Sequence, residues 1–283
     1  MQGAGWSAPL KVDNKLSFQR HVGVHNGEAI IEDYDEALDA FRCRWFGVVL
    51  DTRNRSGPMS LCFDHLIPRK TSRLATSSML ANSMKSDLGP EEFPPVLLEL
   101  ARHKKGAPFN KDIIRFLYWA ERPLPLGAPL PPGLIFLQER TRAVISECDI
   151  CGDPSYPDSI YCPRCRRFVF SGGHDHLPRV RALKRAWDPI LRAFICYYTG
   201  IPLDFTNPKN PWHMTMEHRT PKNDNSQVVA ASWVNAVKTA LSEHEFWAVI
   251  MEYDRWKREG GQFNGNVVKY RYWNRAVRSR IVA

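Results

Sequence analysis

The chain has 283 residues, which is enough for two or three small domains. Its apolar fraction of 43% and charged fraction of 24% are those of ordinary globular proteins, and no apolar run approaches the roughly 18 residues of a membrane span. The net charge of +9 and the pI near 9.3 favour a polyanionic partner such as nucleic acid, because Lys and Arg release counterions when they bind phosphates. A merely basic, ribosome-like surface is the alternative interpretation.

The N-terminus lacks the basic segment and apolar stretch of a secretory signal, and its first Arg is Arg20. We therefore expect an intracellular location (cytoplasm, nucleus or organelle), with a viral or phage origin also compatible. Residues 1–37 are expected to form an extended arm leading into a helix over 27–41, because Ile31, Tyr34 and Leu38 recur at helical spacing.

Strands are predicted at 45–50 and at 59–63, the second leading into Asp64 and His65. Two helices are predicted between 75 and 102, separated by Gly89-Pro90 because Pro cannot continue a helix. Residues 107–145 are rich in Pro and are interpreted as a stiff connection that contains one short helix over 112–121.

Further along, residues 146–170 hold a cysteine cluster, and residues 171–190 belong to a basic helix predicted over 178–195. In the tail, residues 260–283, Lys and Arg alternate with aromatic residues, which suits contact with a phosphate backbone and with bases. A tail packed against the body as an edge strand is the alternative. The candidate nucleic-acid contacts in the basic helix and the tail are Lys184, Arg185, Lys269, Arg271, Arg275 and Arg278.

The stretch from 191 to 257 repeats the stretch from 38 to 104 at a constant offset of 153 residues and without a gap. Direct comparison gives 20 identities in these 67 positions, far more than unrelated segments share. Such self-similarity indicates two copies of one structural unit, which we place at 38–106 and 191–259. The retained positions include chemically active residues, such as His65/His218, Asn82/Asn235 and Lys85/Lys238.

Four of the seven cysteines follow the pattern C-x2-C-x10-C-x2-C, at Cys148, Cys151, Cys162 and Cys165. Each C-x2-C pair can place two thiolates on one tetrahedral zinc ion. The odd number of cysteines and the absence of a signal argue against disulfides. We expect a structural zinc site, because four thiolates leave no open position for a substrate; His174 and His176 nearby are better interpreted as part of a loop.

The second copy contains Glu217-His218, then Pro221, Asn225, and Asn235 ahead of Lys238. This order resembles the HNH endonuclease family (the ββα-metal nucleases), and the resemblance covers residues 191–246 and, in the first copy, 38–93. The family pattern implies that His218 is the general base, that Glu217 and Asn235 hold one Mg²⁺ or Mn²⁺ ion, and that Asn225 braces the hairpin loop and orients the histidine. It places Lys238, one turn after Asn235, toward the phosphate.

In the first copy the corresponding residues are Asp64 and His65 on the strand, and Asn82 and Lys85 on the helix. Both copies depart from the family pattern. The second has Glu217 where Asp is commoner, and its interval from Asn225 to Asn235 is one residue long, so Ser226 is an alternative to Asn225. The first has Ser72 and Arg73 in place of the middle Asn.

Cys43 and Cys196 lack the partner cysteines of a further zinc site and are expected to be buried core residues. The expected fold is α+β, with two duplicated ββα modules and a small zinc knuckle. The expected function is divalent-metal-dependent hydrolysis of phosphodiester bonds in nucleic acid, with duplex DNA favoured over RNA. The alternative is a catalytically inactive nucleic-acid-binding or structural component of a larger assembly, such as an organellar ribosome or a virus.

Overall fold

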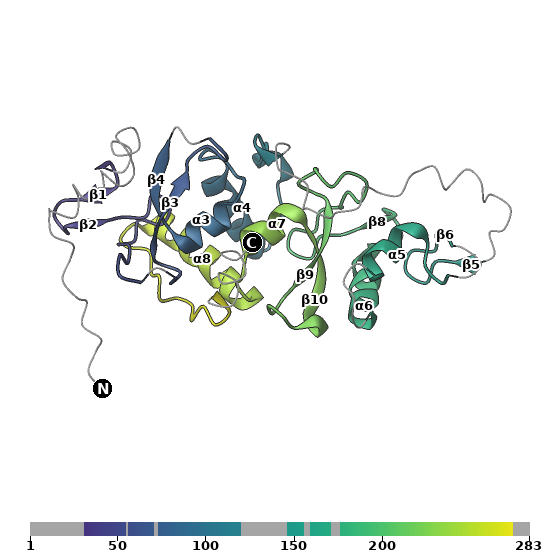
Figure 1. The fold of residues 1–283 in the computed structure, drawn as a ribbon. Coiled ribbons are helices and arrows are strands. Elements are labelled where there is room, and N and C mark those ends of the chain that lie inside the picture. Colours follow the sequence, from purple (N-terminus) through teal and green to yellow (C-terminus); the bar gives the residue numbers. More distant parts are fainter. Residues whose placement is uncertain are drawn as a thin grey trace. The chain divides into compact units, whose positions relative to one another are not determined.

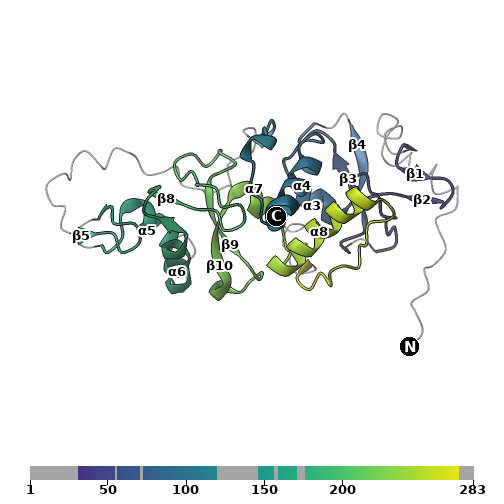
Figure 2. The same cartoon turned by 180° about the vertical axis from the view of Figure 1, so that it is seen from behind.

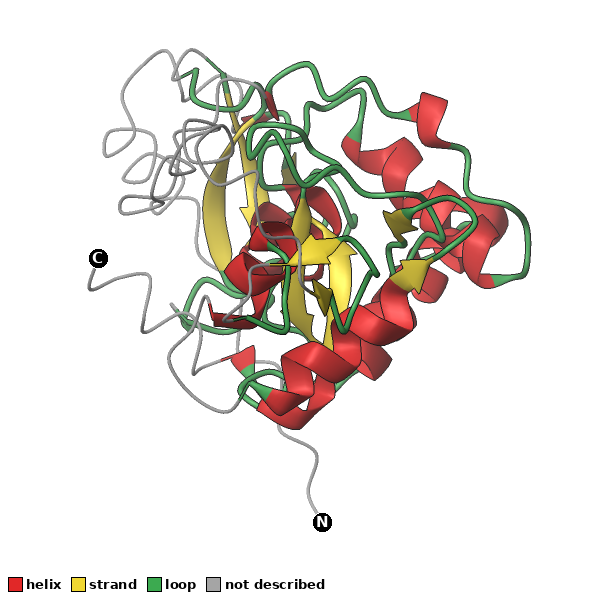
Figure 3. Ribbon diagram, turned by 90° about the vertical axis from the view of Figure 1, so that its right-hand side faces the viewer, coloured by secondary structure: helices red, strands yellow, loops and turns green. Residues whose placement is uncertain are grey.

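The computed structural model describes residues 31–54, 56–70, 73–119, 146–155, 159–170 and 176–273. Its described part is α+β, as expected: helices accompany short antiparallel two-stranded sheets (Figures 1 and 3). Among the described helices, none combines the length and the apolar character needed to cross a membrane. The expected arm over 1–26 and most of the Pro-rich stretch lie outside the described residues.

The first half begins with a small hairpin, followed by a longer hairpin and two helices. The elements are β1 (Tyr34–Asp35), β2 (Ala40–Phe41), β3 (Leu61–His65), β4 (Leu74–Ser78), α3 (Met79–Lys85), α4 (Phe93–Lys104) and the 3-10 turn η1 (Lys111–Ile113). The cysteine-rich region then contributes β5 (Ser146–Glu147), β6 (Pro154–Ser155), α5 (Pro163–Phe170) and α6 (Leu177–Ala186).

The elements that follow repeat the first half. They are β7 (Trp187–Asp188), β8 (Ala193–Phe194), β9 (Met214–His218), the 3-10 turn η4 (Asp224–Ser226), β10 (Gln227–Ala231), α7 (Ser232–Lys238) and α8 (Glu243–Glu259). The bounds of β7, β8, β9, β10 and α7 lie 153 residues after those of β1, β2, β3, β4 and α3. The strand register agrees as well, since His65 pairs with Leu74 and His218 pairs with Gln227.

Three of the helix predictions were wrong in part, because turn residues interrupt the helical spacing. Residues 34–41 form the β1–β2 hairpin, where the Asp35 side chain accepts the Leu38 N–H at the turn. The basic helix ends at Ala186 instead of 195, because Asp188-Pro189 starts another turn in which Asp188 accepts the N–H groups of Ile190 and Leu191. The helix expected over 112–121 is reduced to η1.

The strand predictions are confirmed in one place and wrong in another. The strand expected at 59–63 appears as β3, two residues later. The strand expected at 45–50 is replaced by a tight turn, in which Gly47 adopts a left-handed backbone (φ +65°) and its N–H bonds the carbonyl of Cys43. The break between α3 and α4 lies at Gly89-Pro90, as expected.

The chain divides into two compact units that do not coincide with the expected boundaries at 106 and 259. Unit 1 contains the described residues up to Gly106, then Asp112–Tyr118, and those from Ala236 onward. Unit 2 contains Ala107–Lys111 and the described residues between Trp119 and Asn235. Helix α8, from the second copy, therefore belongs to the same compact unit as β3, β4, α3 and α4.

Unit 1 is built around the pairing of α4 and α8, which lie side by side (Figures 1 and 2). Equivalent residues line this pair: Phe93, Val96 and Leu100 from α4, and Phe246, Val249 and Tyr253 from α8 are all buried. A buried glutamate on each helix binds the arginine three residues later, Glu99 with Arg102 and Glu252 with Arg255. The two copies thus contribute matching helices to one core.

Each copy is followed by an arm that packs on the other copy. The arm after α8 lies in unit 1, where Phe263 stacks on Phe46 at 4.7 Å between ring centroids and Trp273 Nε1 donates to the carbonyl of Ser56 at 3.1 Å. The arm after α4 contributes Phe109 to unit 2, where it contacts Trp212 and Trp233. Phe109, within the stretch 107–145 that was interpreted as a stiff connection, is thus a core residue of unit 2, and Phe263 and Trp273 are core residues of unit 1.

Candidate functional site

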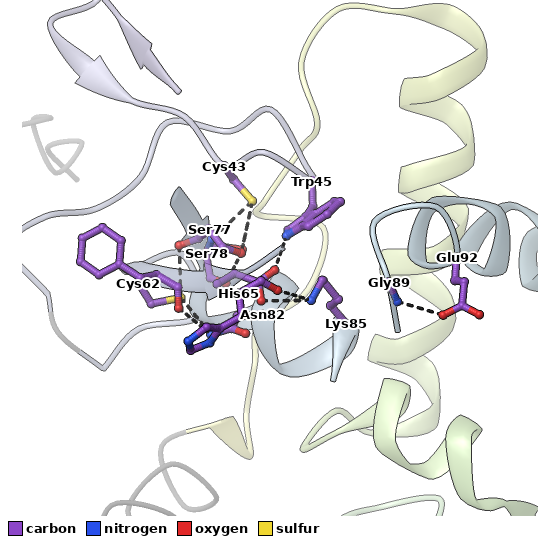
Figure 4. Close-up of polar contacts among 12 residues, drawn as sticks. Cys43, Trp45, Cys62, His65, Ser77, Ser78, Asn82, Lys85, Gly89 and Glu92 are labelled. Carbon is purple, nitrogen blue, oxygen red and sulfur yellow. Dashed lines mark hydrogen bonds and ion pairs between the residues drawn. The ribbon is translucent and has the colours of Figure 1, made fainter. Parts of the chain in front are cut away.

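In the first copy, the predicted metal ligand Asp64 lies inside the protein. It is 3% exposed, and its two carboxylate oxygens bind Lys85 Nζ at 3.2 Å and Trp45 Nε1 at 2.7 Å (Figure 4). Burial raises the pKa of Asp64, against the opposing effects of Lys85 and Trp45. The carboxylate is thus held by two buried donors.

Lys85, the counterpart of the lysine that the family pattern places toward the phosphate, is buried. Its side chain is 1% exposed, and besides Asp64 it donates to the carbonyl of His65 at 2.8 Å. Its counterpart Lys238 is also fully buried and donates to the carbonyl of Leu241 at 2.6 Å. Each lysine thus donates to a backbone carbonyl, Lys85 at the end of β3 and Lys238 just after α7.

The two asparagines on the helices make equivalent contacts. Asn82 Nδ2 donates to the carbonyl of Phe63 and approaches Cys62 Sγ at 3.6 Å (Figure 4). Asn235 Nδ2 approaches Thr215 Oγ1 at 3.4 Å. Cys62 and Thr215 occupy the same position in β3 and β9, two residues before the carboxylate, so their side chains share the carboxylate's face of the strand. Each Asn therefore reaches the strand face from which Asp64 or Glu217 projects.

In the second copy, His218 contacts Gln227, its partner across the hairpin. The side-chain nitrogen of Gln227 lies 3.2 Å from His218 Nε2. Gln227 is buried, so this contact holds the histidine ring from the neighbouring strand.

Two arginines flank this histidine. Arg185, near the end of α6, donates to the carbonyl of Gln227 at 3.4 Å, and α6 packs along β10. Arg219 follows His218 directly, and its guanidinium lies 5.4 Å from the ring centroid of Tyr197. In the first copy the positions of Arg185 and Arg219 hold Glu32 and Leu66. The basic setting therefore belongs to the second copy.

The loop between β9 and β10 is braced by residues other than Asn225. Ser226 Oγ accepts the N–H of Thr220 at 3.0 Å, and Asn223 Oδ1 accepts the N–H of Asn225 at 3.1 Å. Asn225 itself is exposed. The bracing role predicted for Asn225 thus falls to Ser226, the stated alternative, and to Asn223. The contact to His218 comes from Gln227.

The four predicted zinc ligands come together in unit 2. The sulfur atoms of Cys148, Cys151, Cys162 and Cys165 lie within 4.8 Å of one another, all four residues are buried, and none forms a disulfide. The Sγ–Sγ distances from Cys151 to Cys162 and to Cys165 are both 3.6 Å, close to the roughly 3.8 Å between thiolates on a tetrahedral ion with Zn–S bonds of ~2.3 Å. The cluster can hold a metal ion.

Local backbone geometry forms this cluster. Gly152 adopts φ +73° directly after Cys151 and bonds the carbonyl of Cys148, while Cys162 and Cys165 lie at the start of α5. Hydrogen bonds from Cys165 lower the pKa of Cys162 to about 5, whereas burial raises the pKa of Cys151 to about 11. His176 lies outside the cluster, with Nδ1 at the carbonyl of Val169, and His174 lies outside the described residues.

The remaining cysteine predictions agree with the structure. Cys43 and Cys196 are buried, and each sulfur accepts a backbone N–H from the end of the long hairpin, from Ser78 at 3.3 Å and from Ala231 at 3.4 Å. The thiols act as small buried acceptors that hold the segments around Cys43 and Cys196 to the long hairpins, β3–β4 and β9–β10.

The predicted nucleic-acid contacts are distributed over both units. Lys184 is exposed and forms an ion pair with Asp149 at 2.9 Å. Lys269 and Arg271 are exposed on the second arm, and Arg275 and Arg278 lie outside the described residues. Sequence analysis missed Tyr197, Arg219 and Gln227, which surround His218. Comparison of the two copies could have pointed to these three residues, because the first copy has Arg44, Leu66 and Leu74 at the same positions.

Comparison of the chain with protein-family models, with curated proteins and with solved structures finds no match.

Proposed function

We propose that the protein is a nucleic-acid phosphodiesterase of HNH type whose working site surrounds His218. The observation that supports this most is the basic setting of that histidine. Arg185 and Arg219 flank His218 and Gln227, whereas His65 has Glu32 and Leu66 at the equivalent positions. Guanidinium groups beside a proton acceptor suit a phosphodiester, whose charge they attract and whose backbone they position.

We also propose that the two copies are duplicates of one ββα module. Five element pairs share their bounds at the offset of 153, the two long hairpins share their register, and equivalent turns share a left-handed residue, Arg69 and Lys222. Non-glycine residues rarely adopt this backbone, so its recurrence at one position supports common descent.

At this site His218 would take the proton of the attacking water, with Gln227 holding the imidazole ring through its contact to Nε2. A Mg²⁺-type ion would supply charge stabilisation at the scissile phosphate. The chemistry of the donors fits such an ion: Glu217 offers a carboxylate, and Asn235 reaches the same strand face, where its amide nitrogen meets Thr215. Oxygen ligands from Glu and Asn are those that this hard cation prefers.

The cysteine cluster is proposed to bind one structural zinc ion. Four buried sulfurs at near-tetrahedral spacing match a closed Cys₄ site. Arg164, from the same α5 as Cys165, pairs with Asp153 and lies over Trp187, Phe194 and Phe205. The zinc element thereby supports the β7–β8 hairpin, which follows the end of the basic helix.

The experiment compares matched histidine variants for cleavage of DNA and RNA with Mg²⁺ or Mn²⁺, with binding measured in parallel. His218→Ala should lower the cleavage rate by about 10²–10⁴-fold while leaving affinity nearly unchanged, because loss of a general base affects the rate of the chemical step. His65→Ala should cleave as the unmodified protein does. Equal losses in both variants, or unchanged cleavage in His218→Ala, would contradict the assignment of the working site.

The second candidate function is non-catalytic nucleic-acid binding, and the burial of both carboxylates, Asp64 and Glu217, favours it. In the first copy Lys85 and Trp45 bind the carboxylate. If neither carboxylate takes a metal ion, the unmodified protein will bind nucleic acid and hydrolyse none with any divalent ion. Calorimetric titration with Mn²⁺ tests this separately: binding that Glu217→Gln abolishes supports the enzyme, and absence of binding supports the scaffold.

A further inference from the structure

We propose that Tyr197 and Arg219 form a stacking platform for an unpaired nucleic-acid base beside His218, so that the strand bound at the second copy is single-stranded at this point. This inference rests on the proposed function and names the class of its substrate. The shared chemistry is an unstacked nucleobase on a phosphate backbone, which single-stranded DNA and RNA both provide.

Tyr197 presents an exposed ring on a fixed backbone. The residue is 48% exposed, although its backbone N–H bonds the carbonyl of Val229 at 2.9 Å and its ring meets that of the buried Tyr198 edge to face at 5.1 Å. The Arg219 guanidinium, 5.4 Å from the ring centroid, orients it further. An aromatic side chain held in place before binding loses little conformational entropy when a base stacks on it.

The platform lies at the His218 end of the hairpin. Arg219 follows His218 in the chain, and its backbone N–H bonds the carbonyl of Ser226. Arg185 reaches the adjacent carbonyl of Gln227 from α6, which packs along β10. One strand passing this end can therefore place a phosphate near the two guanidinium groups and an adjacent base on the tyrosine ring.

The first copy lacks the platform, since it has Arg44 and Leu66 at the two positions. Arg44 is engaged by two carboxylates, Asp33 at 2.6 Å and Glu32 at 3.0 Å. The aromatic ring and its arginine thus occur together in the copy that also carries Arg185. This association is expected if the ring serves the strand that the arginines attract.

The bases of an intact duplex are covered on both faces by their neighbours. A base must be unstacked before an aromatic side chain can lie against it, which costs a few kcal/mol in a duplex and much less in a single strand. The geometry therefore points to single strands, flaps or unpaired ends.

The test measures binding of the full chain to fluorescent 20-nucleotide probes without added Mg²⁺ or Mn²⁺, so that no cleavage is involved. The probes are single-stranded DNA, the same sequence as RNA, the DNA duplex, and an abasic DNA strand of equal length and charge. The unmodified protein should bind both base-bearing single strands more tightly than the abasic strand. Tyr197→Ala should weaken binding to them about tenfold and remove the preference over the abasic strand, because stacking is lost while phosphate contacts remain.

Matched variants separate stacking from folding. Tyr197→Phe should keep the preference, and Arg219→Lys should reduce it, because an ammonium keeps the charge but cannot stack. Phe170→Ala removes another aromatic side chain of unit 2 that is also 48% exposed, and it should have no effect. Equal binding of abasic and base-bearing strands by the unmodified protein, or a preference retained in Tyr197→Ala, would overturn the platform. A preference that depends on Tyr197, in a protein that never hydrolyses nucleic acid, would overturn the proposed catalysis and leave the platform standing.

Discussion

At the scale of single residues, Asp64 and its counterpart Glu217 are both buried carboxylates. In the first copy a buried ammonium neutralises the carboxylate that the HNH pattern assigns to a metal, and Trp45 supplies a further donor. A buried carboxylate with such partners stabilises the fold only as part of the complete set, since removing one partner leaves the other charge without compensation.

Lys85→Met should therefore lower the free energy of unfolding by about 3–5 kcal/mol, because Asp64 remains buried without a cation. The double variant Lys85→Met/Asp64→Leu should recover most of this loss, since both charges are removed. Urea unfolding gives the values. Lys70→Met, at an exposed lysine, is the control and should change stability by no more than about 0.5 kcal/mol. A Lys85 variant as stable as the Lys70 variant would show that the pair contributes nothing.

A second residue gives the protein a specific response to acid. His213 is buried in unit 2, with its ring 6.4 Å from that of Phe168, and burial lowers its pKa below 6.5, assisted by Arg167 and opposed by Asp204. A folded pKa below the unfolded one means that folding favours the neutral ring. The resulting stability is complete above pH 6.5 and is lost as the pH falls through the folded pKa.

We expect the free energy of unfolding to fall from pH 7 to pH 5 by a larger amount in the unmodified protein than in His213→Phe, which keeps the ring contact and cannot take a proton. Urea unfolding at the two pH values measures both differences. Equal pH dependence in the two proteins would show that His213 does not charge on unfolding.

At the scale of elements, we predict that the cysteine cluster binds a metal ion that α5 needs in order to fold. Cys162→Ser should release the metal and raise amide exchange through α5, because ligand binding and folding are coupled at such sites. Metal analysis of the unmodified protein should find one zinc per chain, and the variant should have none. Cys62→Ser, at a partly buried cysteine outside the cluster, is the control and should keep the zinc. A protein without zinc and with unchanged exchange in α5 after Cys162→Ser would contradict the site.

Some of these elements could be predicted from the sequence, whereas the two short hairpins could not. The ligand spacing of the four cysteines and the Gly-Pro break between α3 and α4 are local signals with one physical meaning, and both agree with the structure. The β1–β2 and β7–β8 hairpins were predicted as helices, because Tyr34, Leu38 and Phe41 have helical spacing. In these turns Asp35 and Asp188 accept backbone N–H groups, which favours a turn over a helix. The helical spacing of apolar residues does not reveal these hydrogen bonds.

The surroundings of His218 were harder to predict, because its contacts come from three separate segments. Arg185 belongs to α6, Tyr197 follows β8, and Gln227 opens β10, so their meeting depends on the packing of α6 along β10. The burial of Lys85 and Lys238 could likewise not be predicted from the sequence, because charged residues are seldom fully buried unless they are paired.

At the scale of the whole molecule, the sequence similarity between the two halves continues into the arms, beyond the gapless repeat. One residue is inserted after α8, so the offset becomes 154, and Phe109, Asn110, Tyr118 and Trp119 reappear as Phe263, Asn264, Tyr272 and Trp273. The backbone agrees: Glu92 accepts the N–H of Leu117 at 2.9 Å, and Glu245 accepts that of Arg271 at 3.0 Å. The insertion explains why gapless comparison stopped short of the arms.

Because each arm packs on the other copy, a substitution in one arm should destabilise the copy on which that arm packs. Phe263→Ala removes a buried ring that stacks on Phe46, and Phe109→Ala removes one that contacts Trp212 and Trp233. Each should cost about 3–5 kcal/mol of local stability, because the cavity lies in a packed core. Hydrogen exchange with mass spectrometry locates the loss.

Exchange should rise around Phe46 and along β3 in Phe263→Ala, with β9 and β10 unchanged, and around Trp212 and Trp233 in Phe109→Ala, with β3 and β4 unchanged. Trp247→Ala is the control, since Trp247 lies on α8, is only partly buried, and has Lys104 at 4.8 Å from its ring. If each phenylalanine variant loosened only the copy that precedes its arm, the exchange of arms would be refuted. The reciprocal pattern would instead show that the two copies fold as partners, which explains why the first copy is retained although its carboxylate is closed by Lys85.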